Sequence, residues 1–137
     1  MNAELRVSVR ELVGFTYFPP DIMPGRDTEE LLAGTLAHQG RQRAQADQFE
    51  IEKSVKRTFD REGARITVFG RMDAFRADDP PLIEEIKHCA FLPDEALPEH
   101  RVQALLYAAM MARELDARSV RVRVAYVDER GELLRAF

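Results

Sequence analysis

The chain has 137 residues, of which 45% are hydrophobic and 32% are charged, and its formal net charge is −4. This length suits one domain with a real core, and the composition is that of a soluble globular protein. The negative charge argues against a surface built throughout for polyanions, although metal ions or a local basic patch would still allow such a partner.

The single cysteine, Cys89, excludes an intramolecular disulfide and a multi-cysteine zinc or iron–sulfur site. No apolar run approaches the roughly 18 residues of a membrane span, and the start of the chain lacks the pattern of a signal peptide. We therefore expect a protein of the reducing cytoplasm, without a membrane partner.

The first predicted element is a short helix. Ser8 and Glu11 have the spacing of a capping box, and they predict a helix over residues 9–15. Two prolines in the segment after Phe15 end it. A loop rich in proline and glycine is expected over residues 21–26.

A second capping pair, Asp27 and Glu30, predicts a longer helix over residues 28–46. Its basic end, residues 39–43, is expected to face solvent. The apolar stripe expected on the core side consists of Leu31, Leu32, Leu36 and Ala37.

Alternating apolar and polar side chains predict three strands, over residues 49–59, 65–76 and 81–89. The segments between them, residues 60–63 and 77–81, have the Asp, Gly and Pro content of turns. Short connections of this kind predict a three-stranded antiparallel meander.

The last third of the chain predicts a helix over residues 99–115 and strands over residues 120–126 and 132–137. Together with the earlier elements, they predict an α/β fold with one mixed central sheet and a single domain over residues 1–137. The apolar side of the helix is expected to comprise Val102, Leu105, Leu106, Ala109, Met110 and Ala112.

Side chains alternate along the third predicted strand, so Glu85 and Lys87 share one face. The other face carries Leu82, Glu84 and Ile86. Asp73 lies across the turn, and two acids beside a lysine predict a small divalent-metal site. The alternative is an ordinary cross-strand ion pair on a solvated face. If the acids are clustered, Asp73→Asn is expected to raise the thermal stability of the metal-free chain, because like charges repel.

Three polar side chains on the predicted helices are further candidates. His38 lies one helical turn after Gly34, and Gln103 and Tyr107 lie four residues apart, with His100 one turn earlier. The alternatives are a surface histidine at His38 and an amphipathic tyrosine at the edge of the core, with Gln103 merely exposed.

Four short motifs in this order resemble those of the PD-(D/E)XK nucleases, and in particular their RecB-type branch. They are a GxxxH motif at Gly34–His38, a GxxD motif at Gly70–Asp73, an apolar-acid-x-lysine motif at Ile83–Lys87 and a QxxxY motif at Gln103–Tyr107. Each motif alone is common, but the combination stands on the elements where that family carries it. The resemblance implies a restriction-endonuclease-like core.

The opening segment, residues 5–13, is also similar to the nuclease module at the N-terminus of some bacterial helicases of the XPD type. CRISPR-associated and AddB-like relatives carry four cysteines for an iron–sulfur cluster. With Cys89 alone this chain departs from them, so no cluster is expected. The departure leaves open what steers a DNA strand into the site.

The resemblance implies a site for Mg²⁺ or Mn²⁺. Asp73, Glu85 and the backbone carbonyl of Ile86 would supply oxygen ligands, and the family pattern assigns His38 as a further ligand. Lys87 would position the attacking water or stabilise charge on the phosphate. Whether it also acts as a base stays open.

By the same resemblance, Gln103 and Tyr107 line the cleft and hold the substrate. Candidates for phosphate contacts are Arg41, Arg43, Lys53, Lys56 and Arg57, and the alternative for them is a solvated face.

The implied function is a metal-dependent deoxyribonuclease acting on single strands or DNA ends, in repair, recombination or phage- and CRISPR-type DNA processing. Its rivals are an RNA substrate, a catalytically silent DNA-binding module serving a helicase, and an interaction domain with an ordinary ion-paired sheet. The presence of Asp73, Glu85 and Lys87 together favours an active enzyme. Exonuclease or endonuclease action, and its polarity, stay open.

Overall fold

The computed structural model describes residues 3–17 and 28–137. The expected loop over residues 21–26, the prolines before it and the capping residue Asp27 lie outside the described residues. So does the side chain of Glu30.

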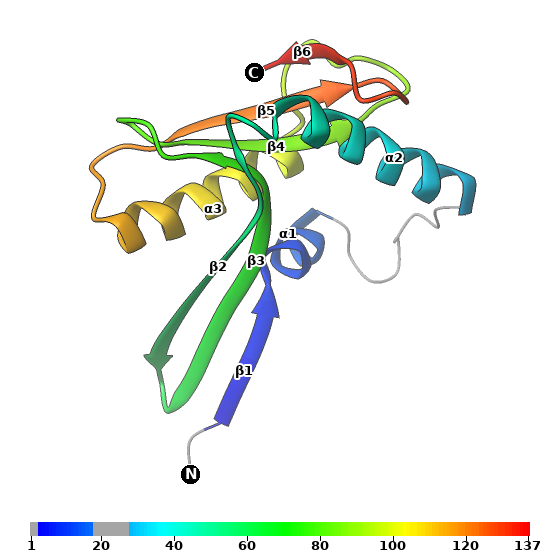
Figure 1. The fold of residues 1–137 in the computed structure, drawn as a ribbon. Coiled ribbons are helices and arrows are strands. Elements are labelled where there is room, and N and C mark those ends of the chain that lie inside the picture. Colours follow the sequence, from blue (N-terminus) through cyan, green and yellow to red (C-terminus); the bar gives the residue numbers. More distant parts are fainter. Residues whose placement is uncertain (1–2, 18–27) are drawn as a thin grey trace.

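A mixed sheet forms the centre of the molecule (Figure 1). The expected antiparallel meander is confirmed: β2 (Glu50–Arg61) pairs with β3 (Ala64–Arg76), which pairs with β4 (Leu82–His88). β5 (Arg121–Val127) runs parallel to β4, and β6 (Leu133–Ala136) closes that side as an antiparallel neighbour of β5. The expectation of one mixed sheet is therefore confirmed.

One strand was not predicted from the sequence: β1 (Ala3–Ser8) pairs in parallel with β3 from Ala64 to Phe69. Its alternation of Leu5 and Val7 with polar residues is a strand pattern. It is only six residues long and mostly exposed, so its main support is a partner about sixty positions away. Local patterning does not reveal such a pairing.

Helices cover the two faces of the sheet separately (Figure 1). α1 (Val9–Tyr17) and α3 (Pro98–Leu115) lie on one face, and α2 (Thr28–Gln45) lies on the other. The capping box of α1 is confirmed, because the backbone N–H of Glu11 donates to Ser8 Oγ at 3.0 Å and that of Ser8 donates to Glu11 Oε1 at 3.3 Å.

The main core lies between the sheet and the α1–α3 pair. Its buried members are Val9, Val13, Val55, Met72, Phe75, Ile83, Tyr107, Ala108, Met110 and Met111. On the α2 face, Ala37, Ile86 and Val127 form a much smaller apolar cluster. The two faces are therefore held by different means: mainly apolar packing under α3 and mainly polar contacts under α2.

The expected faces of α2 were wrong. Leu32 and Leu36 are exposed, and of the described part of the expected stripe only Ala37 is buried. The side chain of Leu31 lies outside the described residues. Within the end expected to face solvent, Gln42 is buried. The physical reason is that the carboxylate of Glu84 on β4 is buried and requires polar partners from this helix.

The expected apolar side of α3 was wrong in part, because Leu105 and Ala109 are exposed whereas Gln103 and Tyr107 are buried. The helix turns this polar pair toward the sheet. Apolar periodicity alone weights Leu105 above Gln103 and so rotates the helix away from its true orientation.

Strict alternation also fails within β2. Glu52 has a positive φ of 54°, and the side chains flanking it change faces: Ile51 packs with Phe49 and Ala74, whereas Val55 joins the main core. Beyond it, Glu62 and Gly63 make a two-residue turn with φ of 51° and 79°, which matches the twist of a hairpin. None of the described helices is long and apolar enough to cross a membrane.

Candidate active site at the opening between β3 and β4

β2 pairs with one edge of β3 along nearly its whole length. The other edge of β3 is shared by β1, which pairs with it as far as Phe69, and by β4, which pairs with it only from Ala74 onward. Between these two pairings the edge of β3 is left open. The segment Gly70–Asp73 lies in this opening. Asp73 Oδ2 accepts a hydrogen bond of 2.8 Å from the backbone N–H of Ile86, so a side chain spans the diverging strands.

Asp73 is held as a carboxylate by its surroundings. His38 Nδ1, from α2, lies 3.6 Å from Asp73 Oδ1. Burial alone would raise the pKa of Asp73. The hydrogen bond and charge of His38, the Ile86 N–H and the charge of Lys87 together outweigh burial and lower this pKa below its usual value. Asp73 is therefore the ionised member of the site.

Glu85 has the opposite character. It is 1% exposed, and its Oε1 has no hydrogen-bond partner among the described residues. Burial raises the pKa of Glu85 well above its usual value, and the neighbouring charge of Asp73 raises it further, although Lys87 acts in the other direction. A buried carboxyl oxygen without a partner is costly unless a proton or a cation satisfies it.

Lys87 and Gln103 meet across the α3 face of the sheet. Lys87 Nζ donates a hydrogen bond of 2.7 Å to Gln103 Oε1, and Gln103 is buried. The prediction that Glu85 and Lys87 share a face is confirmed, because Lys87 contacts α3 whereas Glu84 contacts α2.

Tyr107, one helical turn after Gln103, lies over the same opening. A Cβ atom added to Gly70 would lie 2.7 Å from both Cε1 and the hydroxyl oxygen of Tyr107. Burial raises the pKa of Tyr107 to about 12, with a further contribution from the charge of Glu85 and a smaller one from Asp73. The phenol is therefore a neutral hydrogen-bonding group at physiological pH.

The fold has a solved counterpart. A structure described as "Crystal structure of SSO0001" matches this chain with a TM-score of 0.71 and 18% sequence identity. The match covers 96% of this chain and 65% of the other, so this chain spans about two-thirds of that protein's length. At this identity the likeness shows a shared fold. The sequence matches no protein-family model and no curated protein.

The structure brings together His38, Asp73, Glu85, Lys87, Gln103 and Tyr107, with the backbone of Ile86 beside them. Among the side chains that the structure describes, however, no three His, Cys, Asp or Glu residues already converge as a metal cage. His100 lies elsewhere, with its Nδ1 2.8 Å from the hydroxyl of Tyr126 on β5.

The structure gives a different position to Arg41, which was expected to contact phosphates. Its guanidinium binds Glu84 on the α2 face of β4 and is 16% exposed. Arg43 is exposed. The other three candidates separate: Lys53 pairs with Glu50, Arg57 lies over a ring of its own strand, and Lys56 is exposed.

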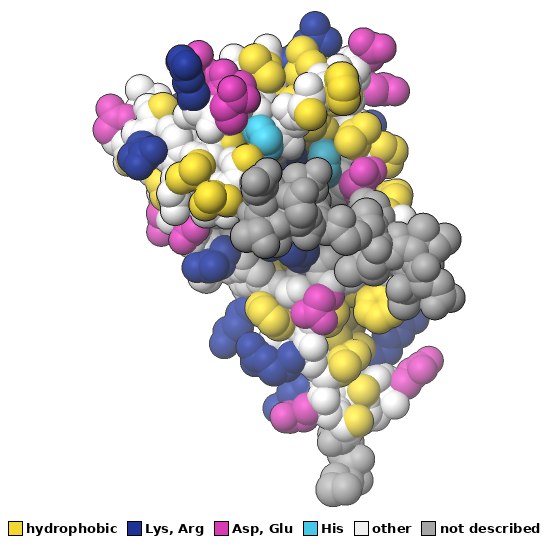
Figure 2. All heavy atoms as spheres, turned by 90° about the vertical axis from the view of Figure 1, so that its right-hand side faces the viewer, with side chains coloured by type: hydrophobic (Ala, Val, Ile, Leu, Met, Phe, Trp, Pro, Cys, Tyr) yellow, Lys and Arg dark blue, Asp and Glu magenta, His cyan; other side chains and the backbone are white. Residues whose placement is uncertain are grey.

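Figure 2 shows Lys and Arg side chains gathered over the lower half of the molecule, where β1, β2 and β3 extend as an arm. The exposed basic residues of this arm are Arg6, Lys56, Arg57, Arg61, Arg65 and Arg71. Two of them have acidic partners, since Arg65 pairs with Asp60 and Arg71 with Glu52. Glu4 and Glu62 are further exposed acids of the arm, so its six exposed basic residues outnumber these four acids by two.

Glu84 is the residue that sequence reasoning missed. It is fully buried and binds Arg41, Gln45 and Arg123. The available signal was its position: an acid in the middle of an apolar strand of a central sheet has little solvent to reach. Such a residue requires donors, and the polar end of α2 supplies them.

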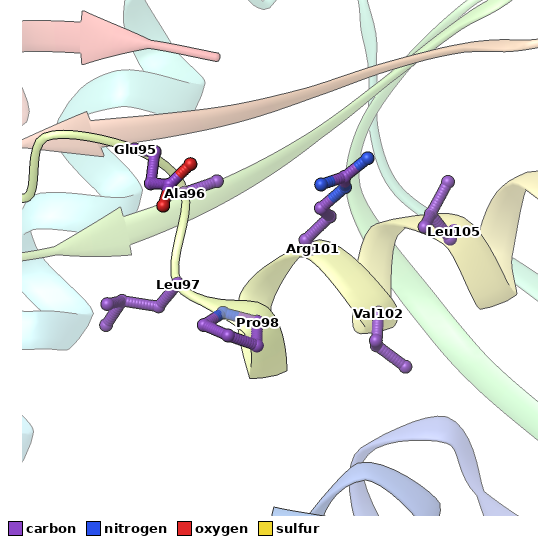
Figure 3. A pocket seen from close by; sticks show the side chains of 7 residues that line it. All are labelled: Glu95, Ala96, Leu97, Pro98, Arg101, Val102 and Leu105. Carbon is purple, nitrogen blue, oxygen red and sulfur yellow. The ribbon is translucent and has the colours of Figure 1, made fainter.

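Two open pockets of the surface lie apart from these groups. One of about 440 Å³ lies at the start of α3 and is lined by Glu95, Ala96, Leu97, Pro98, Arg101, Val102 and Leu105 (Figure 3). A second, also of about 440 Å³, lies between α2 and β2 and is lined by Gln39, Gln42, Arg43, Ala46 and Ile51. Neither of these two pockets is lined by Asp73, Glu85 or Lys87.

Proposed function

We propose that this chain is a metal-dependent nuclease domain with a restriction-endonuclease-like core, which hydrolyses phosphodiester bonds in DNA. The observation that carries the proposal is the pair Asp73 and Glu85. One carboxylate is ionised, and beside it a buried carboxyl has an oxygen without a partner and a raised pKa. A divalent cation would satisfy both carboxyl groups, because it would reduce the repulsion between them and bind the oxygen of Glu85 that has no partner.

The residues present fit Mg²⁺ or Mn²⁺. Asp73, Glu85 and the carbonyl of Ile86 can supply oxygen ligands. His38 Nδ1 lies 3.6 Å from Asp73 Oδ1, so an imidazole nitrogen is close to the same position. Such an ion would neutralise the phosphate and lower the pKa of a bound water. An imidazole ligand favours tolerance of Mn²⁺. The four groups come from α2, β3 and β4, so the folded sheet is required to assemble them.

The remaining side chains have roles that do not depend on the ion. Lys87, held toward α3 by Gln103, places a positive charge beside Glu85, where it can stabilise charge that develops on a phosphate. Tyr107 keeps its proton and can donate to a phosphate oxygen. The ring of Tyr107 packs against Gly70 and borders the opening.

We further propose that the substrate is a DNA single strand or end in the cytoplasm, delivered in some contexts by a fused or associated helicase. Exposed Arg43 and Lys56 are suited to phosphate contacts. Arg41 is not, because Glu84 engages its guanidinium. Since a strand needs only a few such contacts near the site, the overall negative charge is compatible with this substrate.

The proposal is tested by incubating end-labelled single-stranded DNA with the purified chain in Mn²⁺, in Mg²⁺ and in EDTA. RNA of the same sequence and circular single-stranded DNA serve as comparison substrates. We expect cleavage with metal and none with EDTA, and the product ladder gives the polarity. Cleavage of the circle assigns endonuclease action. DNA binding without cleavage in either metal would contradict the enzyme and identify a catalytically silent DNA-binding module.

A further inference from the structure

The side of α2 that faces the sheet is polar. His38, Arg41, Gln42 and Gln45 follow one another at helical spacing and form a single stripe. His38 and Gln42 both reach Asp73: the imidazole faces its carboxylate, and Gln42 Nε2 donates to its backbone oxygen at 3.2 Å. Arg41 and Gln45 instead reach Glu84. One helical face therefore serves two acids on adjacent strands.

Glu84 is fully buried, and donors from two elements surround it. Arg41 donates from Nη2 to Oε1 at 2.9 Å and from Nε to Oε2 at 3.3 Å, while Gln45 donates to Oε2. Arg123, on the neighbouring strand β5, donates from Nε to Oε1 at 2.7 Å. Two of the three donor residues therefore belong to α2, and the third ties the carboxylate to the sheet.

Few apolar contacts hold α2 against the sheet. Ala37 is the one α2 residue in the buried apolar clusters of the described chain, and Leu36 beside it is exposed. The backbone at Gly40 packs against the turn at Gly131, so closely that a Cβ added to Gly40 would collide with the backbone oxygen of Arg130. This contact limits how far the helix stands from the turn. The rotation of the helix about its own axis is then set by the hydrogen bonds of the polar stripe, of which three end on Glu84 and one, from Gln42, ends on the Asp73 backbone.

We propose that Glu84 is a positioning residue, which sets the rotation of α2 through Arg41 and Gln45 and thereby holds His38 against Asp73. The inference rests on the proposed function, because His38 is treated as a metal ligand only there. Glu84 and Glu85 are consecutive residues that point to opposite faces of β4. One strand therefore presents the anchor of the helix on one face and a metal-binding carboxylate on the other.

The test compares two variants that each remove one guanidinium from Glu84 and keep a long side chain. Arg41→Met removes two of the three hydrogen bonds that α2 makes to Glu84 and leaves the one from Gln45, whereas Arg123→Met breaks a link within the sheet. Mn²⁺ affinity is measured by calorimetry without DNA. We expect Arg41→Met to weaken Mn²⁺ binding about 10-fold, in the range seen when the residues supporting metal ligands are removed. Arg123→Met should leave the affinity close to wild type.

A third protein, His38→Ala, separates positioning from general damage. If Arg41 acts through His38, Arg41→Met should cause no further loss of Mn²⁺ affinity once His38 is absent, so the two effects are not additive. Equal losses in the two arginine variants, or additive losses in the double variant, would overturn the proposal.

Amide hydrogen exchange of the metal-free proteins provides a readout that needs no metal. We expect Arg41→Met to speed exchange in α2 around residues 37–45 and to leave α3 unchanged. Uniform acceleration across the chain would overturn the positioning role. A wild-type chain that binds no Mn²⁺ would contradict the proposed function, and the exchange pattern would then decide alone whether Glu84 sets the position of α2.

Discussion

The ring of Tyr107 lies against the backbone of Gly70, so close that a single added carbon would fall 2.7 Å from two of its atoms. This contact explains why a glycine stands in the middle of β3, where its flexibility would otherwise be a disadvantage. It brings α3 onto the opening between the strands and places the phenol beside Glu85, whose charge contributes to the raised pKa of Tyr107.

Gly70→Ala should therefore displace Tyr107 and destabilise the fold by about 1–3 kcal/mol, as other overpacked sites do. Urea denaturation measures this loss. Gly14→Ala is the matched control, because a Cβ there meets nothing within 4 Å in helix α1, and it should stabilise by about 0.5–1 kcal/mol. A Gly70→Ala protein as stable as wild type would show that the ring moves aside freely.

The raised pKa of Glu85 predicts how the stability of the metal-free protein depends on pH. The folded state holds the Glu85 proton more tightly than the unfolded chain, whose carboxyl titrates near pH 4.3. Stability should therefore fall as pH rises from about that value through the raised pKa of the folded state. In Glu85→Gln this loss should be absent.

The measurement is the difference in melting temperature between Glu85→Gln and wild type across this pH range, in EDTA. We expect the difference to grow with pH in favour of the variant, and Mn²⁺ to stabilise only the wild type. A difference that does not change with pH would mean that Glu85 titrates as in an unfolded chain.

Asp73 leads to the opposite prediction, which reverses the one drawn from the sequence. Clustered acids alone suggested that Asp73→Asn would stabilise the metal-free chain. Burial and the neighbouring charge of Asp73 raise the pKa of Glu85, which favours its protonated form and so reduces the repulsion, while His38, the Ile86 N–H and Lys87 favour the Asp73 carboxylate. Asp73→Asn should therefore lower the melting temperature at neutral pH.

Because the pKa of Asp73 is lowered, its stabilising contribution is present above the unfolded value of about 3.9 and is lost as pH falls through the folded value. The deficit of Asp73→Asn should thus be largest near neutral pH and shrink in acid. Thermal melts from neutral to acidic pH provide the test, and a variant more stable than wild type at neutral pH would restore the expectation of simple repulsion.

Glu84 provides a comparison of buried and exposed ion pairs within one sheet. Glu84→Gln leaves Arg41 and Arg123 without their carboxylate, and loss of one partner of a buried pair costs about 3–5 kcal/mol. Glu52→Gln breaks an exposed pair with Arg71, at 3.5 Å, and should cost less than about 1 kcal/mol. Equal effects in urea denaturation would mean that solvent reaches Glu84.

Much of the fold was predictable from local patterns. Alternation along β4 predicted that Glu85 and Lys87 face away from Glu84. The hydrogen bonds that Lys87 donates to Gln103 on α3 and that Arg41 on α2 donates to Glu84 confirm it. The meander, the two longer helices and β5 also follow from periodicity and turn chemistry. These features depend on neighbours within a few residues, which is the range that periodicity reads.

The remainder depended on distant partners. The exposed Leu36 and buried Gln42 invert the expected faces of α2, because a carboxylate about forty residues away needs donors. β1 depends on β3 in the same way. In the site, sequence could place Asp73 and Glu85 close together. The sequence could not show which of the two carboxyl groups has the raised pKa, because that depends on burial and on the groups around each oxygen.

The assignment of Asp73, Glu85 and Lys87 to a nuclease site is tested by single-turnover cleavage of 5′-labelled single-stranded DNA in Mn²⁺. Wild type is compared with Glu85→Gln and Lys87→Met, and with Lys53→Met, whose lysine pairs with Glu50 outside the opening. We predict that both site variants cleave at least about 10²-fold more slowly and that Lys53→Met stays close to wild type. Cleavage by Glu85→Gln at the wild-type rate would show that Glu85 is not part of a nuclease site.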